Sequence, residues 1–372
     1  MTTSLASGIQ GIQDLLPGMD PLLCEQVNNE SPGDVNRTAC TLFDLKYHYT
    51  GTEYYEAMFY SPLQYSQFFA EAFMLQYTSG LEEVAWGQLG DDVPKELSSL
   101  YGQHVALMTL VANRWTSLTY GSQLLGYIVA ALAQSAGLGL DLDGLGPVKP
   151  SDSILLLFAH DTNQAYLREM LELTWFIEGW PMDSLATGGV LSFELVQDEN
   201  RQFVMVKYTT ATPQQQHDAT PLDSGTPPSE AYLIIPECGT HQCPFDEFQR
   251  IALSRLSMSC VSEPLRTTLE GLQQQGASAK NSWGVRTVYK SPNPRSMALL
   301  FFAGVVVAMM SLRIGAVFKR SCARGWQRNR ERAATASMYV RYHDLPSQMT
   351  KHDASVVSTK ITLMRLGGSP LQ

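Results

Sequence analysis

The chain has 372 residues, enough for one large domain or two modest ones, and its formal net charge is −10 at pH 7. The charge is unevenly placed: residues 319–372 hold ten Lys or Arg against three Asp or Glu, a net of +7, which leaves −17 for residues 1–318. The basic residues directly follow a long apolar run. Such a basic segment could bind nucleic acid, but its position beside an apolar run favours membrane lipid headgroups, so no nucleic-acid partner is expected.

Residues 1–50 are interrupted by Gly, Pro and Asn and are predicted to be a mostly irregular lumenal segment. Asn29 and Asn36 each open a glycosylation sequon, and Cys24 and Cys40 flank them as a plausible local disulfide pair. The first residues contain neither a basic stretch nor an apolar core, so no signal peptide is visible. Either the true beginning of the protein is missing from this sequence or the chain is a degenerate copy of a longer protein, and we favour the missing beginning.

Three helices are predicted next, over residues 61–77, 97–115 and 121–136. The first opens at Ser61-Pro62, a capping residue followed by proline at the first helical position. On this helix Glu71 shares a face with apolar side chains, where an unpaired carboxylate is costly to bury. Glu71 therefore either faces a substrate or lies on the helix surface at the edge of the core. His104, on the second helix, is predicted to be a structural or surface histidine rather than a catalytic one.

An unbroken apolar run, residues 154–159, ends abruptly at the polar residues His160, Asp161, Thr162 and Asn163. The run is typical of a strand buried on both faces, and the residues after it have the periodicity of an amphipathic helix. The polar residues are thus predicted where a strand ends and a helix begins, a place where anions bind. Asp161 beside an imidazole would suit proton donation to the leaving group of a bound phosphate. The alternative is that Asp161 or Thr162 only caps the helix and that His160 is an ordinary loop residue.

The segment from Ala159 to Asn163 resembles the His-Asp motif of the histidine acid phosphatases, in particular the branch of phytases and glucose-1-phosphatases. Further segments resemble the same family in the same order: residues 171–175, 187–194, 220–222 and 226–230. Upstream, residues 69–76 resemble the helix that supplies a carboxylate to the family's active site. The resemblance covers roughly residues 60–260, the C-terminal half of the family's domain.

The resemblance implies an α/β fold over residues 51–262, with a partial histidine-phosphatase-like sheet and a helical cap subdomain. It implies that His160 and Asp161 are catalytic: His160 would contact the phosphoryl group of a phosphomonoester substrate, and Asp161 would be the general acid. It places substrate-binding residues at Glu71, Thr162 and Asn163. No cofactor is expected for this chemistry.

One segment of the family is missing from the chain. Family members open with Arg-His-Gly-x-Arg-x-Pro, whose histidine attacks phosphorus and whose arginines hold the phosphoryl oxygens, but no histidine of this chain follows an arginine. The prediction is therefore a histidine acid phosphatase-like protein that is catalytically incomplete. The alternative is a non-catalytic single-span membrane glycoprotein that uses the remnant domain for binding. A sheet lacking its first strand would expose an apolar edge, which predicts instability or pairing with another chain.

The later part of the domain is predicted to contain strands and a disulfide but no metal site. Strands are predicted over residues 189–196, 203–209 and 232–235. Cys238 and Cys243 should form a disulfide, as in the resembling phosphatases, which leaves Cys260 unpaired. The acidic loop at residues 141–152 lacks the glycine and the terminal glutamate of a calcium loop, so no metal is assigned to it.

The apolar run over residues 297–318, at about 20 residues, is long enough to cross a bilayer as one C-terminal transmembrane helix. Residues 263–296 before it are predicted to be a stalk, and residues 319–372 after it a basic cytoplasmic tail. The ectodomain would then lie in the lumen or outside the cell, in an endosomal, lysosomal or surface membrane. In the tail, residues 342–345, from Tyr342 to Leu345, have the form of a signal that sorting adaptors bind.

Overall fold

The computed structural model describes residues 2–16, 24–25, 40–45, 62–140, 154–198, 201–282 and 358–365. The predicted transmembrane helix at 297–318, the sequons at Asn29 and Asn36, and the sorting signal from Tyr342 to Leu345 lie outside the described residues. Within the described part of the chain, no helix combines the length and the apolar character needed to span a bilayer. The membrane anchor therefore stays a prediction from the sequence.

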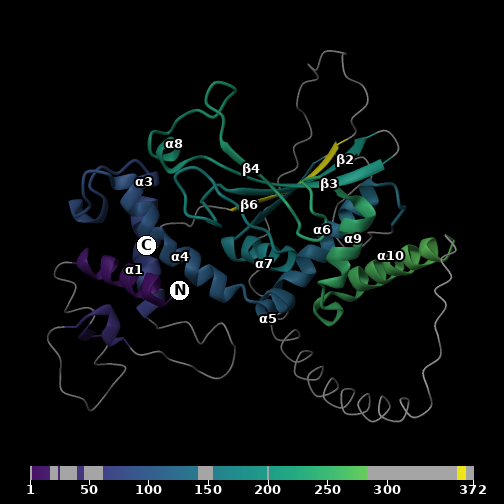
Figure 1. The fold of residues 1–372 in the computed structure, drawn as a ribbon, viewed down its shortest axis with the longest axis horizontal. Coiled ribbons are helices and arrows are strands. Elements are labelled where there is room, and N and C mark those ends of the chain that lie inside the picture. Colours follow the sequence, from purple (N-terminus) through teal and green to yellow (C-terminus); the bar gives the residue numbers. More distant parts are fainter. Residues whose placement is uncertain are drawn as a thin grey trace, which may run out of the picture.

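A six-stranded mixed sheet lies at the centre of the described structure (Figure 1). Its strands are β1 Ile154–Ala159, β2 Val190–Asp198, β3 Arg201–Thr210, β4 Ser229–Leu233, β5 Cys243–Pro244 and β6 Ser358–Arg365. They follow the order β1-β6-β2-β3-β4, and β5 pairs with β3. β1 runs parallel to β6, whereas β2 pairs antiparallel with β6 and with β3. The strands predicted over residues 189–196 and 203–209 are confirmed as β2 and β3.

Helices cover one side of the sheet and form a second group beside it (Figure 1). The helices near the sheet are α6 Ser122–Ser135, α7 Asp161–Leu171, α9 Phe245–Ser254 and α10 Glu263–Ser282. The second group contains α1 Thr2–Asp14, α3 Pro62–Thr78, α4 Val93–Val111 and α8 Pro213–His217. Short helical turns are η1 Leu42–Asp44, η3 Val84–Gly87, α5 Arg114–Thr116, η4 Ser117–Gly121 and η5 Met258–Cys260. The predicted mixture of helices and sheet is confirmed, and α4 joins the two helical groups because it contacts α7.

Strand β1 is less buried than its sequence predicts. Ile154 and Phe158 are 61% and 42% exposed, whereas Leu155, Leu157 and Ala159 pack against the core. The exposed and packed residues alternate, so one face of β1 lies on the core and the other is open among the described residues. The prediction that both faces are buried is therefore wrong.

Two segments in which the sequence analysis predicted no helix each contain one. In α1, part of the predicted irregular segment 1–50, Ile9 and Ile12 are buried. In α10, part of the predicted stalk 263–296, the buried residues are Leu265, Leu269 and Leu272, spaced so that they share one helical face. This face packs against α6, where Leu265 and Leu269 approach Gly126. Burial of the leucine stripe explains why the segment begins as a helix that belongs to the domain.

Strand β6 lies between β1 and β2, a place that the sequence did not predict for it. Residues 358–365 belong to the predicted cytoplasmic tail, yet they pair with β1 over six residues and with β2 over seven. Strands that share backbone hydrogen bonds lie on the same side of a membrane, because a sheet cannot continue through a bilayer as an isolated pair. A membrane between residues 358–365 and the strands β1 and β2 is therefore incompatible with this pairing. β6 also pairs with one edge of β1, and the other edge of β1 has no partner strand among the described residues.

The two predicted disulfides are both present. Cys24 pairs with Cys40, and Cys238 pairs with Cys243 at the start of the β5–α9 segment. Cys260 is also disulfide-bonded, so the prediction of an unpaired thiol is wrong.

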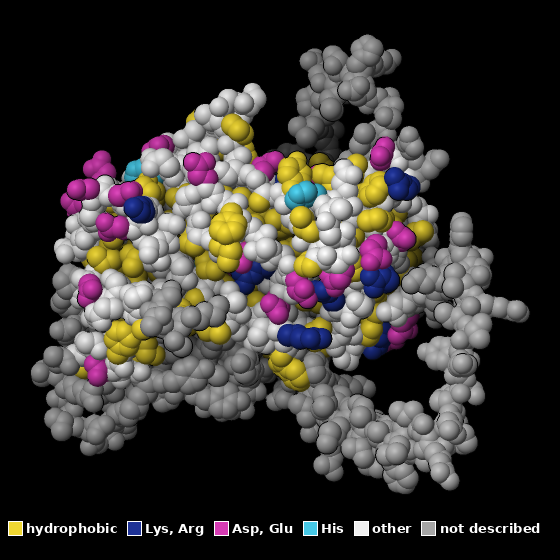
Figure 2. All heavy atoms as spheres, in the orientation of Figure 1, with side chains coloured by type: hydrophobic (Ala, Val, Ile, Leu, Met, Phe, Trp, Pro, Cys, Tyr) yellow, Lys and Arg dark blue, Asp and Glu magenta, His cyan; other side chains and the backbone are white. Residues whose placement is uncertain are grey.

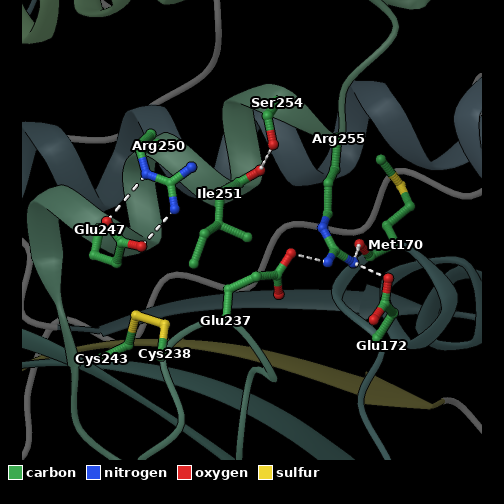
Figure 3. A network of polar contacts seen from close by, with 10 residues as sticks. All are labelled: Met170, Glu172, Glu237, Cys238, Cys243, Glu247, Arg250, Ile251, Ser254 and Arg255. Atoms are coloured by element: carbon green, nitrogen blue, oxygen red, sulfur yellow. Dashed lines mark hydrogen bonds and ion pairs between the residues drawn. A yellow bond between two sulfur atoms is a disulfide. The ribbon is translucent and has the colours of Figure 1, made fainter.

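Acidic side chains gather on the face of the molecule near α3 and α8, as the acidic composition predicts for this domain, whereas acidic and basic side chains lie next to one another near α7 and α9 (Figure 2). Arg255, at the end of α9, is the centre of one such contact (Figure 3). Its guanidinium donates to the carbonyl oxygen of Met170 at 2.8 Å and forms ion pairs with Glu172 at 2.9 Å and with Glu237. Glu172 adopts a left-handed backbone conformation, φ 53°, where α7 ends. Arg255 therefore holds the carboxyl end of α7 in place.

We predict that Arg255→Leu lowers the free energy of unfolding by about 1–3 kcal/mol, because a buried carbonyl and two carboxylates lose their shared donor. Urea unfolding measures this. Arg250→Leu is the matched control: Arg250 pairs with Glu247 at the surface of the same helix, where an ion pair contributes less than about 1 kcal/mol. Equal losses in the two variants would contradict the anchoring role.

The pH dependence of this difference has a defined sign. Burial opposes ionisation of Glu237, but its hydrogen bond and ion pair with Arg255 outweigh burial and lower the pKa of Glu237 below its ordinary value. A lowered folded-state pKa contributes stability above the unfolded pKa, and this contribution is lost as the pH falls through the folded pKa. The difference in free energy of unfolding between the wild type and Arg255→Leu should therefore become smaller in acid, below about pH 4.3.

We predict that Thr362→Pro, in the centre of β6, lowers the free energy of unfolding by at least about 3 kcal/mol, because proline removes a backbone donor from a strand paired on both sides. Thermal unfolding followed by circular dichroism measures this. Thr362→Val keeps the backbone donor and should be close to neutral. A proline variant as stable as the wild type would show that β6 does not pair in the sheet.

Candidate active site

The polar residues after β1 form a rigid strand-to-helix junction, as the sequence predicts. β1 ends at Ala159, and α7 begins at Asp161. The side-chain carbonyl of Asn163 accepts the backbone N–H of His160 at 3.1 Å, and the backbone N–H of Asn163 donates to the carbonyl of His160 at 3.1 Å. Asn163 therefore fixes the residue that precedes the helix. His160 itself is exposed.

Asp161 lies in the first turn of α7, where the helix dipole favours negative charge. Its Oδ1 accepts the backbone N–H of Thr162 at 2.6 Å. Its Oδ2 lies 3.5 Å from Nε2 of His104, and the carboxylate side chain is 14% exposed. Asp161 is therefore accessible to solvent on one side and in contact with a buried imidazole on the other.

His104, in α4, is the centre of the cluster and is 1% exposed. Its Nδ1 lies 2.9 Å from Oε1 of Gln67 and 3.6 Å from Oε2 of Glu71, both on α3. The ring of Tyr101, one turn earlier in α4, stacks on the imidazole at 4.8 Å. The imidazole thus lies between two carboxylates that come from different helices.

The helices that carry these groups are held together by a buried arginine. Arg168 of α7 is 5% exposed and donates to Oγ1 of Thr109 in α4 at 2.9 Å and to the carbonyl of Asp183 at 3.2 Å. Burial lowers the pKa of Arg168, while the negative charges of Asp183 and Glu169 raise it in part. The contact between α7 and α4 places Asp161 against His104.

The structure therefore brings Glu71 and Asp161, two of the predicted site residues, to a common neighbour. Thr162 contributes its backbone N–H to Asp161, and Asn163 supports the junction. The catalytic and substrate-binding roles assigned to these residues and to His160 stay predictions. Sequence analysis placed His104 outside the site. A signal was present, because His104 lies on the same face of α4 as the buried residues Leu97, Tyr101 and Leu107, and a buried imidazole needs polar partners.

The cluster can do two kinds of chemistry. A carboxyl group next to an imidazole can store and donate a proton. Glu71, His104 and Asp161 also each offer one ligand atom within 4.8 Å of the others, a spacing compatible with a metal ion.

No family model matches the chain. Among curated proteins, phytase AppA of Escherichia coli (strain K12) is 33% identical over 171 residues, which is 45% of this chain and 38% of that protein. The glucose-1-phosphatase of Salmonella typhimurium is 24% identical over 238 residues, which is 62% of this chain and 54% of that protein. The chain thus spans about half or less of the length of these relatives.

Among solved structures, the Hafnia alvei phytase in complex with myo-inositol hexakis sulphate aligns with a TM-score of 0.54 and 23% identity, over 70% of this chain and 61% of the other. The phytase from Citrobacter braakii aligns with a TM-score of 0.54 and 24% identity, over 70% and 62%. At this identity the structures show a shared fold. The comparisons confirm the resemblance found in the motifs: the relatives of this chain are a phytase and a glucose-1-phosphatase, the branch of the histidine acid phosphatases that the sequence resembles over part of its length.

Proposed function

We propose that the domain binds phosphomonoesters at the edge where β1 meets α7 and that Asp161 is the proton donor of a histidine acid phosphatase-like site. The observation that carries the proposal is the position of Asp161, in the first turn of α7 and beside His104, within a fold shared with phytases. The relatives named above are a phytase and a glucose-1-phosphatase, and both names denote enzymes that act on phosphate esters.

Strand β6 runs to the same edge of the sheet. It ends at Arg365, which is in register with Ala159, the residue before His160. Because β1 and β6 are parallel, both strands end at this edge, where ligands bind in sheets of this kind. Arginine is suited to phosphate oxygens because its guanidinium offers several donors in one plane. We therefore propose that Arg365 contributes to phosphate binding.

Turnover by this chain is proposed to be slow. The family's reaction passes through a phosphohistidine, and no histidine of this sequence follows an arginine as the nucleophile does in the family. A general acid alone contributes about 10²–10⁴-fold to a rate, so binding of the ester is the property that the described site supports best.

We predict that the full chain binds 4-nitrophenyl phosphate in isothermal titration calorimetry and that Arg365→Ala weakens this binding about tenfold or more, the loss expected for a charge-assisted hydrogen bond. Asp161→Asn should bind equally or more tightly, because it removes a negative charge from the neighbourhood of the phosphate dianion. Arg250→Ala, at the surface of α9, is the matched control for loss of a positive charge and should change nothing.

Two results would contradict the proposal in different ways. Absence of binding, or binding that Arg365→Ala leaves unchanged, would remove the phosphate site at this edge. Rapid hydrolysis of the aryl phosphate by the wild type, lost in Asp161→Ala, would show that the chain is a complete enzyme with a nucleophile elsewhere.

A further inference from the structure

One ring nitrogen of His104 lacks the hydrogen-bond partner that a buried polar atom normally has. Nε2 is buried and has no hydrogen-bond partner among the described residues. Its nearest carboxylate oxygen, Oδ2 of Asp161, lies 3.5 Å away, beyond the usual 2.7–3.2 Å of an N–H···O hydrogen bond. Leaving such a group buried without a partner is costly.

The same distance suits two ligands of one metal ion. In a tetrahedral zinc site the metal–nitrogen and metal–oxygen distances of about 2.0–2.2 Å place neighbouring ligand atoms about 3.4 Å apart. The 3.5 Å between Nε2 of His104 and Oδ2 of Asp161 is close to this value. Glu71 completes a set whose ligand atoms lie within 4.8 Å of one another. Its side chain is 22% exposed, so one side of the set is open to solvent.

Gln67 orients the imidazole as residues around metal-bound histidines do. Its Oε1 can only accept a hydrogen bond, so at 2.9 Å it assigns the ring proton of His104 to Nδ1. Nε2 then carries a lone pair directed to the side of Asp161. A histidine ligand characteristically donates its second ring N–H to an oxygen in this way, which fixes the tautomer that binds the metal.

We infer that Glu71, His104 and Asp161 bind a divalent transition-metal ion, of which Zn²⁺ fits best. Two carboxylates and one imidazole form a mixed oxygen and nitrogen set, which suits Zn²⁺ rather than Mg²⁺ or Ca²⁺, ions that take oxygen ligands. The two carboxylates neutralise the charge of the ion. Both are partly exposed, so the ion has access, and a water molecule can complete the tetrahedron.

The inference does not depend on the proposed phosphatase-like function. It concerns the ligand atoms of three side chains and is tested by binding of the metal itself. If both hold, metal and proton compete for the carboxylate of Asp161, and bound Zn²⁺ withholds the proton donor.

The test is titration of the metal-free full chain with Co²⁺ at neutral pH, followed by its visible absorption, and then displacement of Co²⁺ by Zn²⁺. We expect one tight site per chain. His104→Gln should weaken binding more than about 100-fold, since loss of a supporting contact alone costs 10–100-fold. Gln67→Met keeps the side-chain length but removes the acceptor for Nδ1, so it should weaken metal binding by about 10–100-fold.

His241→Gln is the matched control, because His241 is an exposed loop residue that is not among the three ligands. This variant should bind the metal as tightly as the wild type does. If His104→Gln fails to fold, metal binding by Glu71→Gln and Asp161→Asn provides the test, since each variant replaces one ligand by a side chain of the same shape. A wild type without a tight site, or a site that survives all three ligand substitutions, would overturn the inference. Loss of phosphate binding with the metal site intact would affect only the proposed function.

Discussion

The site depends on how one buried imidazole is satisfied. His104 is almost fully excluded from solvent and carries two ring nitrogens that need partners. α3 supplies Gln67 and Glu71 on the Nδ1 side, and α7 supplies Asp161 on the Nε2 side. Because the partners come from different helices, the positions of α3 and α7 relative to α4 are constrained by the same ring. The stability of the helical group and the geometry of the site are therefore linked.

The junction of β1 and α7 could be predicted because its signal is local. An apolar run that stops at a polar cluster places Asp161 at a helix start, whatever surrounds it, and the structure agrees. The role of His104 could not be predicted in the same way. Its spacing within α4 shows that it is buried, but its partners lie on helices whose packing no local pattern specifies. For Glu71, the choice between surface and site was left open for the same reason.

The missed elements have clear local patterns but distant partners. Leu265, Leu269 and Leu272 form a helical stripe whose partner is α6. Residues 358–365 include three β-branched residues, which are enriched in strands: Thr359, Ile361 and Thr362. Both lie in segments assigned by their proximity to the apolar run at 297–318. The sequence analysis assigned both segments from the apolar run because its signal is stronger. In the structure, β6 forms backbone hydrogen bonds with a strand on each side, β1 and β2.

Three effects act on the carboxylate of Asp161, and they do not act in the same direction. The first turn of α7 and the N–H of Thr162 favour the charged form, and a metal ion would favour it further. Proton donation to a phosphate ester requires the neutral form. The proposed proton donor and the proposed metal ligand are therefore the same side chain, and the two proposals require it in opposite protonation states.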